Sequence, residues 1–157
     1  MRKRIFKQSA QDVAPTNQQR LNVETLAQVE ITSENAAHPI ESALIPGAGS
    51  RWRAARPGPQ TIRLLFDEPQ RIRRLHLVFQ EGDYERTQQF VLRWSSDGGH
   101  SYREIVRQQY NFSAPDATSE CEDYAVDLHG VNALELSIVP DISGGSACAS
   151  LDQMRIA

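Results

Sequence analysis

The 157-residue sequence has little cysteine, no long apolar run and no excess of positive charge. Its two cysteines, Cys121 and Cys148, are too few for a disulfide scaffold, and their spacing matches no metal-binding motif. We therefore expect two reduced thiols. No segment approaches the roughly 20 apolar residues needed to span a bilayer. The net charge of −3 and the pI near 5.8 argue against a polyanion binder, so we expect no nucleic acid and no membrane as partners.

The start of the chain lacks the apolar run of an export signal. Basic residues at Met1–Arg4 are followed by a segment that breaks off before such a run could form. We expect a cytoplasmic protein in which residues 1–19, basic and then polar, form a flexible arm. Residues 20–157 would then form one domain, long enough to bury a sizeable core.

Residues for catalysis are not found in a usable arrangement. A nucleophilic site brings a Ser or Cys, a His and a carboxylate together. The histidines of this chain stand singly: His38, His76, His100 and His129. Gly144-Gly145-Ser146 is not a nucleophile elbow, which needs G-x-S-x-G after a strand. We expect no catalytic residues, no cofactor and a protein that is not an enzyme.

What the sequence does have is alternation of apolar and polar residues. In the segment Gln88–Gly99, every second residue from Phe90 to Trp94 is apolar, which is typical of a half-buried strand. Ser96–Gly99 supplies a tight turn, and Tyr102–Val106 resumes as the second strand of a hairpin. We expect Trp94 to face the core.

Other strands are expected at residues 27–31, 61–66, 72–80, 124–128, 134–138 and 149–156. The Pro- and Gly-rich stretch 33–59 and the stretch from Tyr110 to Asp123 are expected to be loops. About eight short strands without a long amphipathic helix predict an all-β protein, a β-sandwich or jelly roll. The basic segment Arg71–Arg74 has two interpretations: contact with an acidic ligand or partner, or an edge strand protected by charge.

Four segments carry a likeness to a known family through their order and spacing. They are Gly49–Trp52, Gln60–Ile72, Phe90–Gly99 and Ala149–Ile156. Together they resemble the discoidin family, the galactose-binding-like jelly roll also found as the C-type domains of coagulation factors. The resemblance implies a galactose-binding-like jelly-roll sandwich of about eight strands over residues 30–157. It also implies a non-catalytic module that binds a carbohydrate or glycan ligand, or, as the alternative, a rigid platform for a protein partner.

Many domains of that family hold a structural Ca²⁺ behind the early loop, through an Asp in the loop and a Glu in the last strand. In this sequence those positions fall near Ile45 and at Gln153, neither of which is charged. Glu41 or Asp152 could substitute only in a rearranged loop. We expect no bound metal ion.

Ligand contacts are expected from exposed aromatic residues in loops. An aromatic face stacks on the C–H surface of a sugar, while polar side chains bond its hydroxyls. Tyr84, in the loop Glu81–Arg86, and Tyr110 are the expected aromatic residues. The expected polar partners are His38, Arg51, Arg53 and Arg86. Their loops should gather at one end of the sandwich, where Phe112 could equally act as a structural plug.

Overall fold

The computed structural model describes residues 20–157; the expected arm, residues 1–19, lies outside them. The elements in chain order are α2 (Val23–Leu26), β1 (Ala27–Ile31), α3 (Glu41–Leu44), β2 (Trp52–Arg53), β3 (Gln60–Gln80), β4 (Arg86–Ser95), β5 (Arg103–Phe112), β6 (Ser119–Val139), β7 (Ser150–Leu151) and β8 (Gln153–Ile156). Neither helix in this part of the chain is long and apolar enough to cross a membrane.

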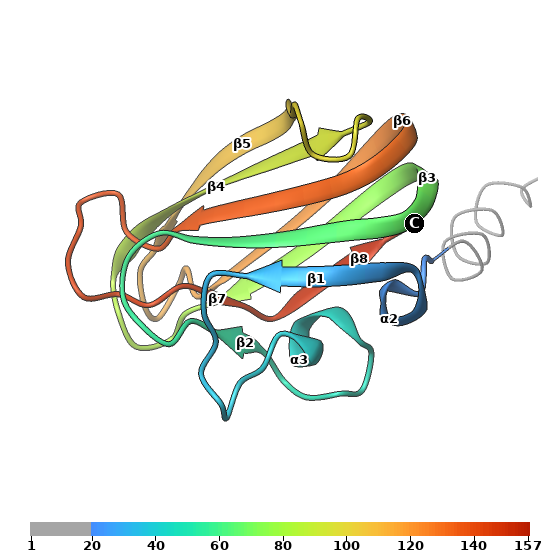
Figure 1. Ribbon diagram of the computed structural model, residues 1–157. Coiled ribbons are helices and arrows are strands. Elements are labelled where there is room, and N and C mark those ends of the chain that lie inside the picture. The colour runs from blue at the N-terminus through green and yellow to red at the C-terminus, as the bar shows by residue number, and fades with distance from the viewer. Residues whose placement is uncertain (1–19) are drawn as a thin grey trace, which may run out of the picture.

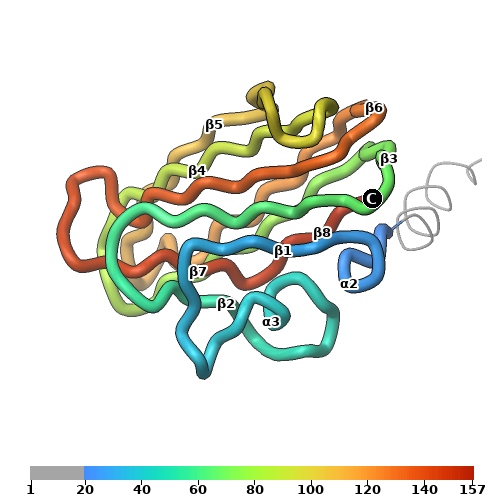
Figure 2. Tube along the Cα trace, in the orientation of Figure 1, coloured from blue at the N-terminus to red at the C-terminus, as the bar shows by residue number. Residues whose placement is uncertain are grey.

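Two long strands, β3 and β6, take part in both layers of a sandwich (Figure 2). Residues 60–65 of β3 pair with residues 133–138 of β6, whereas residues 72–80 pair with residues 119–128. The register shifts between these two stretches, where both strands bend. The larger layer has the strand order β1-β3-β6-β4-β5, and the smaller layer is formed by β8 and the other halves of β3 and β6.

The core lies between the two layers. Phe79, on the β3 half in the smaller layer, packs on Phe90 of β4 in the larger layer, with 5.2 Å between ring centroids. Trp52 is fully buried, and its indole Nε1 donates a hydrogen bond to the carbonyl oxygen of Ser33 at 3.1 Å. The ring therefore fills the core without leaving its N–H group unpaired.

Trp94 lies at the rim of the core, not inside it as the alternation predicts. It pairs with Leu134 of β6 and packs against the core, but it remains half-buried. The reason is its place one residue before the end of β4. The Arg103 guanidinium lies over the indole, 5.7 Å from the ring centroid, so part of the ring is covered by a solvated side chain.

The expected strands are confirmed, with changes at their ends. The strands expected at 61–66 and 72–80 join into β3, and those at 124–128 and 134–138 join into β6. The expected loop 33–59 contains α3 and β2. The loop expected from Tyr110 to Asp123 is mostly strand, because β5 continues to Phe112 and β6 begins at Ser119. The inward position Glu120 in this stretch is polar, as is Gln88 of β4, with which Glu120 is hydrogen-bonded, and this hides the alternation.

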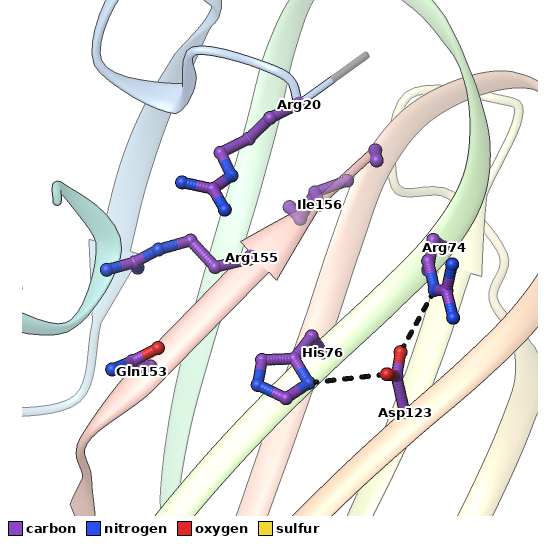
Figure 3. A pocket seen from close by; sticks show the side chains of 8 residues that line it. Arg20, Arg74, His76, Asp123, Gln153, Arg155 and Ile156 are labelled. Atoms are coloured by element: carbon purple, nitrogen blue, oxygen red, sulfur yellow. Dashed lines mark hydrogen bonds and ion pairs between the residues drawn. The ribbon is translucent and has the colours of Figure 1, made fainter. Parts of the chain in front are cut away.

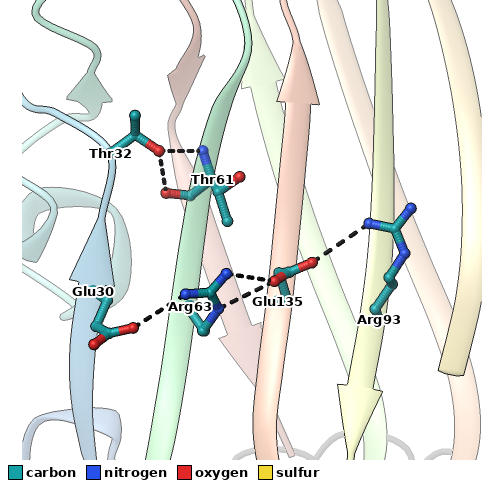
Figure 4. Close-up of polar contacts among 6 residues, drawn as sticks. All are labelled: Glu30, Thr32, Thr61, Arg63, Arg93 and Glu135. Carbon is teal, nitrogen blue, oxygen red and sulfur yellow. Dashed lines mark hydrogen bonds and ion pairs between the residues drawn. The ribbon is translucent and has the colours of Figure 1, made fainter. Parts of the chain in front are cut away.

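The exposed face of the larger layer carries a row of alternating charges across four strands (Figure 4). From β1 to β4 the row consists of Glu30, Arg63, Glu135 and Arg93. Arg63 contacts Glu30 at 3.2 Å and Glu135 at 2.8 Å, and Arg93 contacts the other oxygen of Glu135 at 3.4 Å. A one-residue slip of any strand would turn its charge toward the core, so the row fixes the register.

Candidate ligand-binding site

Several connections meet at one end of the sandwich, at the left of Figure 1. The strand registers place them there: β3 begins opposite the end of β6, and β4 begins opposite the end of β5. Residues 54–59, 81–85, 113–118 and 140–149 therefore lie at the same end. The early loop that follows β1 starts there too, because Ile31 pairs with Ile62 near the start of β3.

Two adjoining pockets lie between these loops. We call them the Arg51 pocket, with a volume of about 420 Å³, and the Tyr84 pocket, with a volume of about 240 Å³. Both are lined by Arg53, Glu81 and Cys148, so they are two parts of one hollow. We refer to the two pockets together as the Arg53 cleft.

The Arg53 cleft brings together four of the six residues predicted to contact a ligand. They are Arg51, Arg53, Tyr84 and Arg86. Tyr84 is 64% exposed, as expected for a residue that presents its ring to a ligand. His38 lies beside Arg53 through the backbone, where the Arg53 N–H donates to the His38 carbonyl at 3.1 Å. The His38 side chain lines neither pocket.

Tyr110 is a strand residue and does not share the cleft with Tyr84. It pairs with Gln88 inside the sheet, and its ring contacts that of Phe112 edge-on, with 5.0 Å between centroids. Phe112 is fully buried, with the Arg86 guanidinium 4.7 Å from its ring centroid. Phe112 thus closes this end of the core, and the expected site with two tyrosines is not formed.

Arg86 is a buried anchor, whereas the sequence suggested an exposed donor. Its side chain is 1% exposed; Nε donates to Glu81 Oε1 at 2.8 Å, and Nη1 donates to the carbonyl oxygen of Pro140 at 2.8 Å. The other oxygen of Glu81 accepts the backbone N–H groups of Asp83 and Tyr84, at 3.1 and 3.3 Å. Arg86 therefore ties loop 81–85 to loop 140–149 and positions Tyr84.

The two arginines of the early loop differ in their partners. Arg51 Nη2 contacts Asp152 Oδ2 at 3.4 Å, and the other oxygen of Asp152 accepts the Gln80 N–H at 3.0 Å. Within residues 20–157, the Arg53 side chain makes no hydrogen bond and no ion pair, although it lines both pockets. Arg53 is the guanidinium whose donors are available to a ligand.

No protein-family model matches this sequence, and no curated protein matches it. Solved structures match in fold. The family 32 carbohydrate-binding module of NanJ from Clostridium perfringens, in complex with galactose, gives a TM-score of 0.65 at 10% identity and covers 87% of this chain and 96% of its own. The chain has a discoidin-like jelly-roll fold. The jelly-roll sandwich expected from the sequence is thereby confirmed as a fold.

Two further structures support the same jelly roll. A Clostridium perfringens module in complex with GalNAc-β-1,3-galactose has a TM-score of 0.65 at 17% identity, covering 87% of this chain and 98% of its own. The family 32 module of AlyQ in complex with 4,5-unsaturated mannuronic acid has a TM-score of 0.61 at 16% identity, covering 84% and 95%.

Part of the cleft in this jelly roll was not predicted. Glu81 and Cys148 line both pockets, and Asp141 lines the Tyr84 pocket. From the sequence, residues 140–145 are only a break before the strand expected at residues 149–156. Its signal was Gly144-Gly145, whose φ angles of 86° and 96° allow a tight turn that other residues rarely adopt. Cys148 and Cys121 are free thiols.

The residues behind the early loop do not fit a hard-cation site. Gln153 brings a neutral amide, and Asp152 is bonded to Arg51 and to the Gln80 N–H. Arg155 Nη1 donates to the carbonyl oxygen of Ala43 in α3 at 2.7 Å. This guanidinium puts a fixed positive charge beside the loop carbonyl groups, where it would repel a second cation.

Calcium should therefore leave the stability of the protein unchanged. An ion that binds only the native state raises the melting temperature by mass action. A thermal melt in millimolar Ca²⁺ should match a melt in chelator. A rise of several degrees that chelator reverses would show that Glu41 or Asp152 rearranges to bind the ion.

Proposed function

We propose that the Arg53 cleft binds carbohydrate and that the protein is a non-catalytic binding module. The observation that carries this proposal is the position of Tyr84, whose ring is 64% exposed beside a polar pocket. A ring in such a place offers its face to the C–H surface of a sugar. The structural neighbours support the ligand class, since they hold galactose, a GalNAc-galactose disaccharide and an unsaturated mannuronic acid.

Donors and acceptors for sugar hydroxyls surround the ring. Arg53 supplies donors without a partner among the described residues, and Glu85 and Asp141 supply carboxylate oxygens in the Tyr84 pocket. Arg86 and Glu81 neutralise each other as a buried pair. The charges of the pocket thus nearly balance, which favours a neutral sugar over an anionic one.

The protein-platform alternative has less support. A docking surface for a protein partner presents an apolar patch of roughly several hundred Å². In residues 20–157 the exposed large hydrophobic side chains are those of Tyr84 and Ile142. Both belong to loops that border the Tyr84 pocket. Two exposed side chains give an apolar surface of the size of a sugar ring, not a broad patch.

The histidines of the described chain support a non-catalytic role. His76 Nδ1 lies 3.7 Å from Asp123, and His129 Nε2 lies 3.1 Å from Asp127. Neither imidazole hydrogen-bonds a hydroxyl or thiol group of residues 20–157. Each pair therefore offers a general base but no nucleophile.

Replacing Tyr84 with alanine should weaken sugar binding about tenfold, because the stacking face is lost. Isothermal titration with galactose, N-acetylgalactosamine and a uronic acid measures the affinities. Tyr84→Phe keeps the ring face and should bind like the wild type. The melting temperature of both variants should stay unchanged, because the side chain is mostly exposed.

Arg53→Gln provides a second variant of the same cleft, with Arg107→Gln on β5 as its matched control. Arg107 is an exposed arginine paired with Glu104 at 2.9 Å, outside both pockets. Arg53→Gln should weaken binding and Arg107→Gln should not. Wild-type affinity in both Tyr84→Ala and Arg53→Gln would place the ligand elsewhere.

A further inference from the structure

A separate pocket of about 320 Å³ lies on the outer face of the smaller layer (Figure 3). Its polar lining comes from the segment before α2 and from β3, β6 and β8. The residues are Arg20, Arg74, His76, Asp123, Gln153 and Arg155. None of them lines the Arg53 cleft. The basic segment Arg71–Arg74, which the sequence left with two interpretations, ends at this pocket.

Strand pairing puts these side chains on one face. His76 of β3 pairs with Arg155 of β8 on one side and with Asp123 of β6 on the other. Paired residues point to the same side of a sheet, so the three form a row across the layer. The Leu21 N–H donates to the Ile156 carbonyl at 2.8 Å, which holds the neighbouring Arg20 beside β8.

Positive charge in the pocket exceeds negative charge. Three guanidinium groups face one carboxylate, that of Asp123. One carboxylate oxygen of Asp123 accepts a hydrogen bond from Arg74 Nε at 3.2 Å, and the other lies 3.7 Å from His76 Nδ1. The acceptors of Arg155 are the backbone carbonyl oxygens of Ala43 and Met154, which bring no charge. Among the lining side chains, guanidinium groups thus outnumber carboxylates in a protein of net charge −3.

Two effects disfavour the charged form of Arg155 in this pocket. Burial lowers the pKa of its guanidinium, and the nearby positive charge of Arg20 lowers it further. Two guanidinium groups that face each other without an anion are in a repulsive arrangement. An anion between them would remove that repulsion.

We propose that this pocket binds a doubly charged tetrahedral oxyanion, a phosphate or sulfate group. Such a group brings two negative charges to a lining in which guanidinium groups outnumber carboxylate side chains. Guanidinium groups also offer paired N–H donors that match the oxygens of phosphate and sulfate. The Gln153 amide and the His76 imidazole add donors around the same space. This proposal does not depend on carbohydrate binding in the Arg53 cleft.

The group can arrive as a free ion or as an ester on a sugar, and titration distinguishes the two. Isothermal titration of the full chain at constant ionic strength is done with inorganic phosphate, inorganic sulfate, galactose 6-phosphate and galactose. We expect saturable binding of both inorganic ions. Equal affinity for galactose 6-phosphate means that the group alone is recognised. Tighter binding of the ester in the Tyr84→Ala background means that this pocket also contacts the sugar.

Charge variants test the position of the ion. The double change Arg20→Gln with Arg74→Gln should weaken phosphate binding about tenfold or more, because two positive charges of the lining are lost. Asp123→Asn removes the competing carboxylate and should tighten binding. The matched control is Arg71→Gln on the same strand, where Arg71 contacts Asp127 at 3.0 Å outside the pocket. We expect it to bind phosphate like the wild type.

Three results would overturn the proposal. Heats that do not saturate at constant ionic strength would mean that no site exists. Equal weakening by Arg71→Gln and by the double variant would mean general screening of surface charge. Wild-type affinity of a folded Arg20→Gln/Arg74→Gln protein, with its melting curve measured in parallel, would place the ion elsewhere.

Discussion

Arg86→Met should lower the free energy of unfolding by about 3–5 kcal/mol, because removing one partner of a buried ion pair leaves the other charge without compensation. Methionine has a similar length, so the loss is of charge and hydrogen bonds more than of volume. The carboxylate of Glu81, which is only 15% exposed, would lose the guanidinium that it contacts at 2.8 Å. The Pro140 carbonyl would lose its donor at 2.8 Å.

The same variant should also weaken ligand binding, for a reason that differs from that of Tyr84→Ala. Loops 81–85 and 140–149 lose their common anchor, so Tyr84 is no longer held beside the pocket. Urea unfolding measures the stability, and titration with sugar well below the melting temperature measures the binding. Arg107→Met, with its exposed partner Glu104, is the control and should change stability little. A loss below about 1 kcal/mol for Arg86→Met would contradict the anchoring role.

Glu120→Gln should stabilise the protein at neutral and alkaline pH and flatten the pH dependence of its stability. Glu120 is 1% exposed; burial raises its pKa, the neighbouring Glu122 carboxyl raises it further, and the value is about 8. Gln88 Nε2 donates to Glu120 Oε1 at 3.1 Å, while Oε2 has no donor among the described residues. A proton on the Glu120 carboxyl avoids burying a second negative charge beside Glu122.

The direction of the effect follows from proton binding. Between about pH 4.5 and pH 8 the native protein keeps a proton on Glu120 that the unfolded chain has released. This contribution to stability is therefore fully present below about pH 4.5 and is lost as the pH rises toward 8. Glutamine imitates the protonated carboxyl at every pH, so at pH 8 the variant should be more stable by about 2–4 kcal/mol.

Urea unfolding at pH 5, 7 and 9 tests this prediction. The difference between Glu120→Gln and the wild type should be small at pH 5 and should grow toward pH 9. Glu104→Gln, an exposed change on β5, should follow the wild-type curve at all three values. A constant difference from pH 5 to pH 9 would mean that the native state does not raise the pKa of Glu120.

Much of the fold could be predicted because alternation reports burial directly. Residues 62–64 and 134–138 alternate, since one side faces a core of Ile62, Leu64, Leu134 and Leu136 and the other carries polar side chains. Alternation fails where the inward side is polar. Glu120 and Glu122 point inward along the start of β6, so this stretch resembles a loop although it pairs with β3. Trp94 follows the alternation of Phe90 and Leu92, but it lies where the core ends and is therefore only half-buried.

The candidate site was less predictable, because burial and side-chain partners depend on residues far away in the sequence. The polar neighbours of Arg86 in the sequence predict an exposed side chain. It is buried because Pro140, 54 residues away, and Glu81 both bond its guanidinium. Tyr84 needed no such partners, since a tyrosine in a short polar loop is exposed by default. Cys148 could not be assigned to the cleft before loop 140–149 was placed beside Arg53.

The most direct test of carbohydrate binding in the Arg53 cleft is a ¹H–¹⁵N correlation titration of the full chain with galactose and N-acetylgalactosamine. We predict saturable shifts concentrated in the backbone amides of residues 51–53, 81–85 and 140–149. The amides at the opposite end, in the turn 96–102, should stay in place. Shifts confined to that turn or to the outer face of the smaller layer, or no saturable shift with either sugar, would contradict the account.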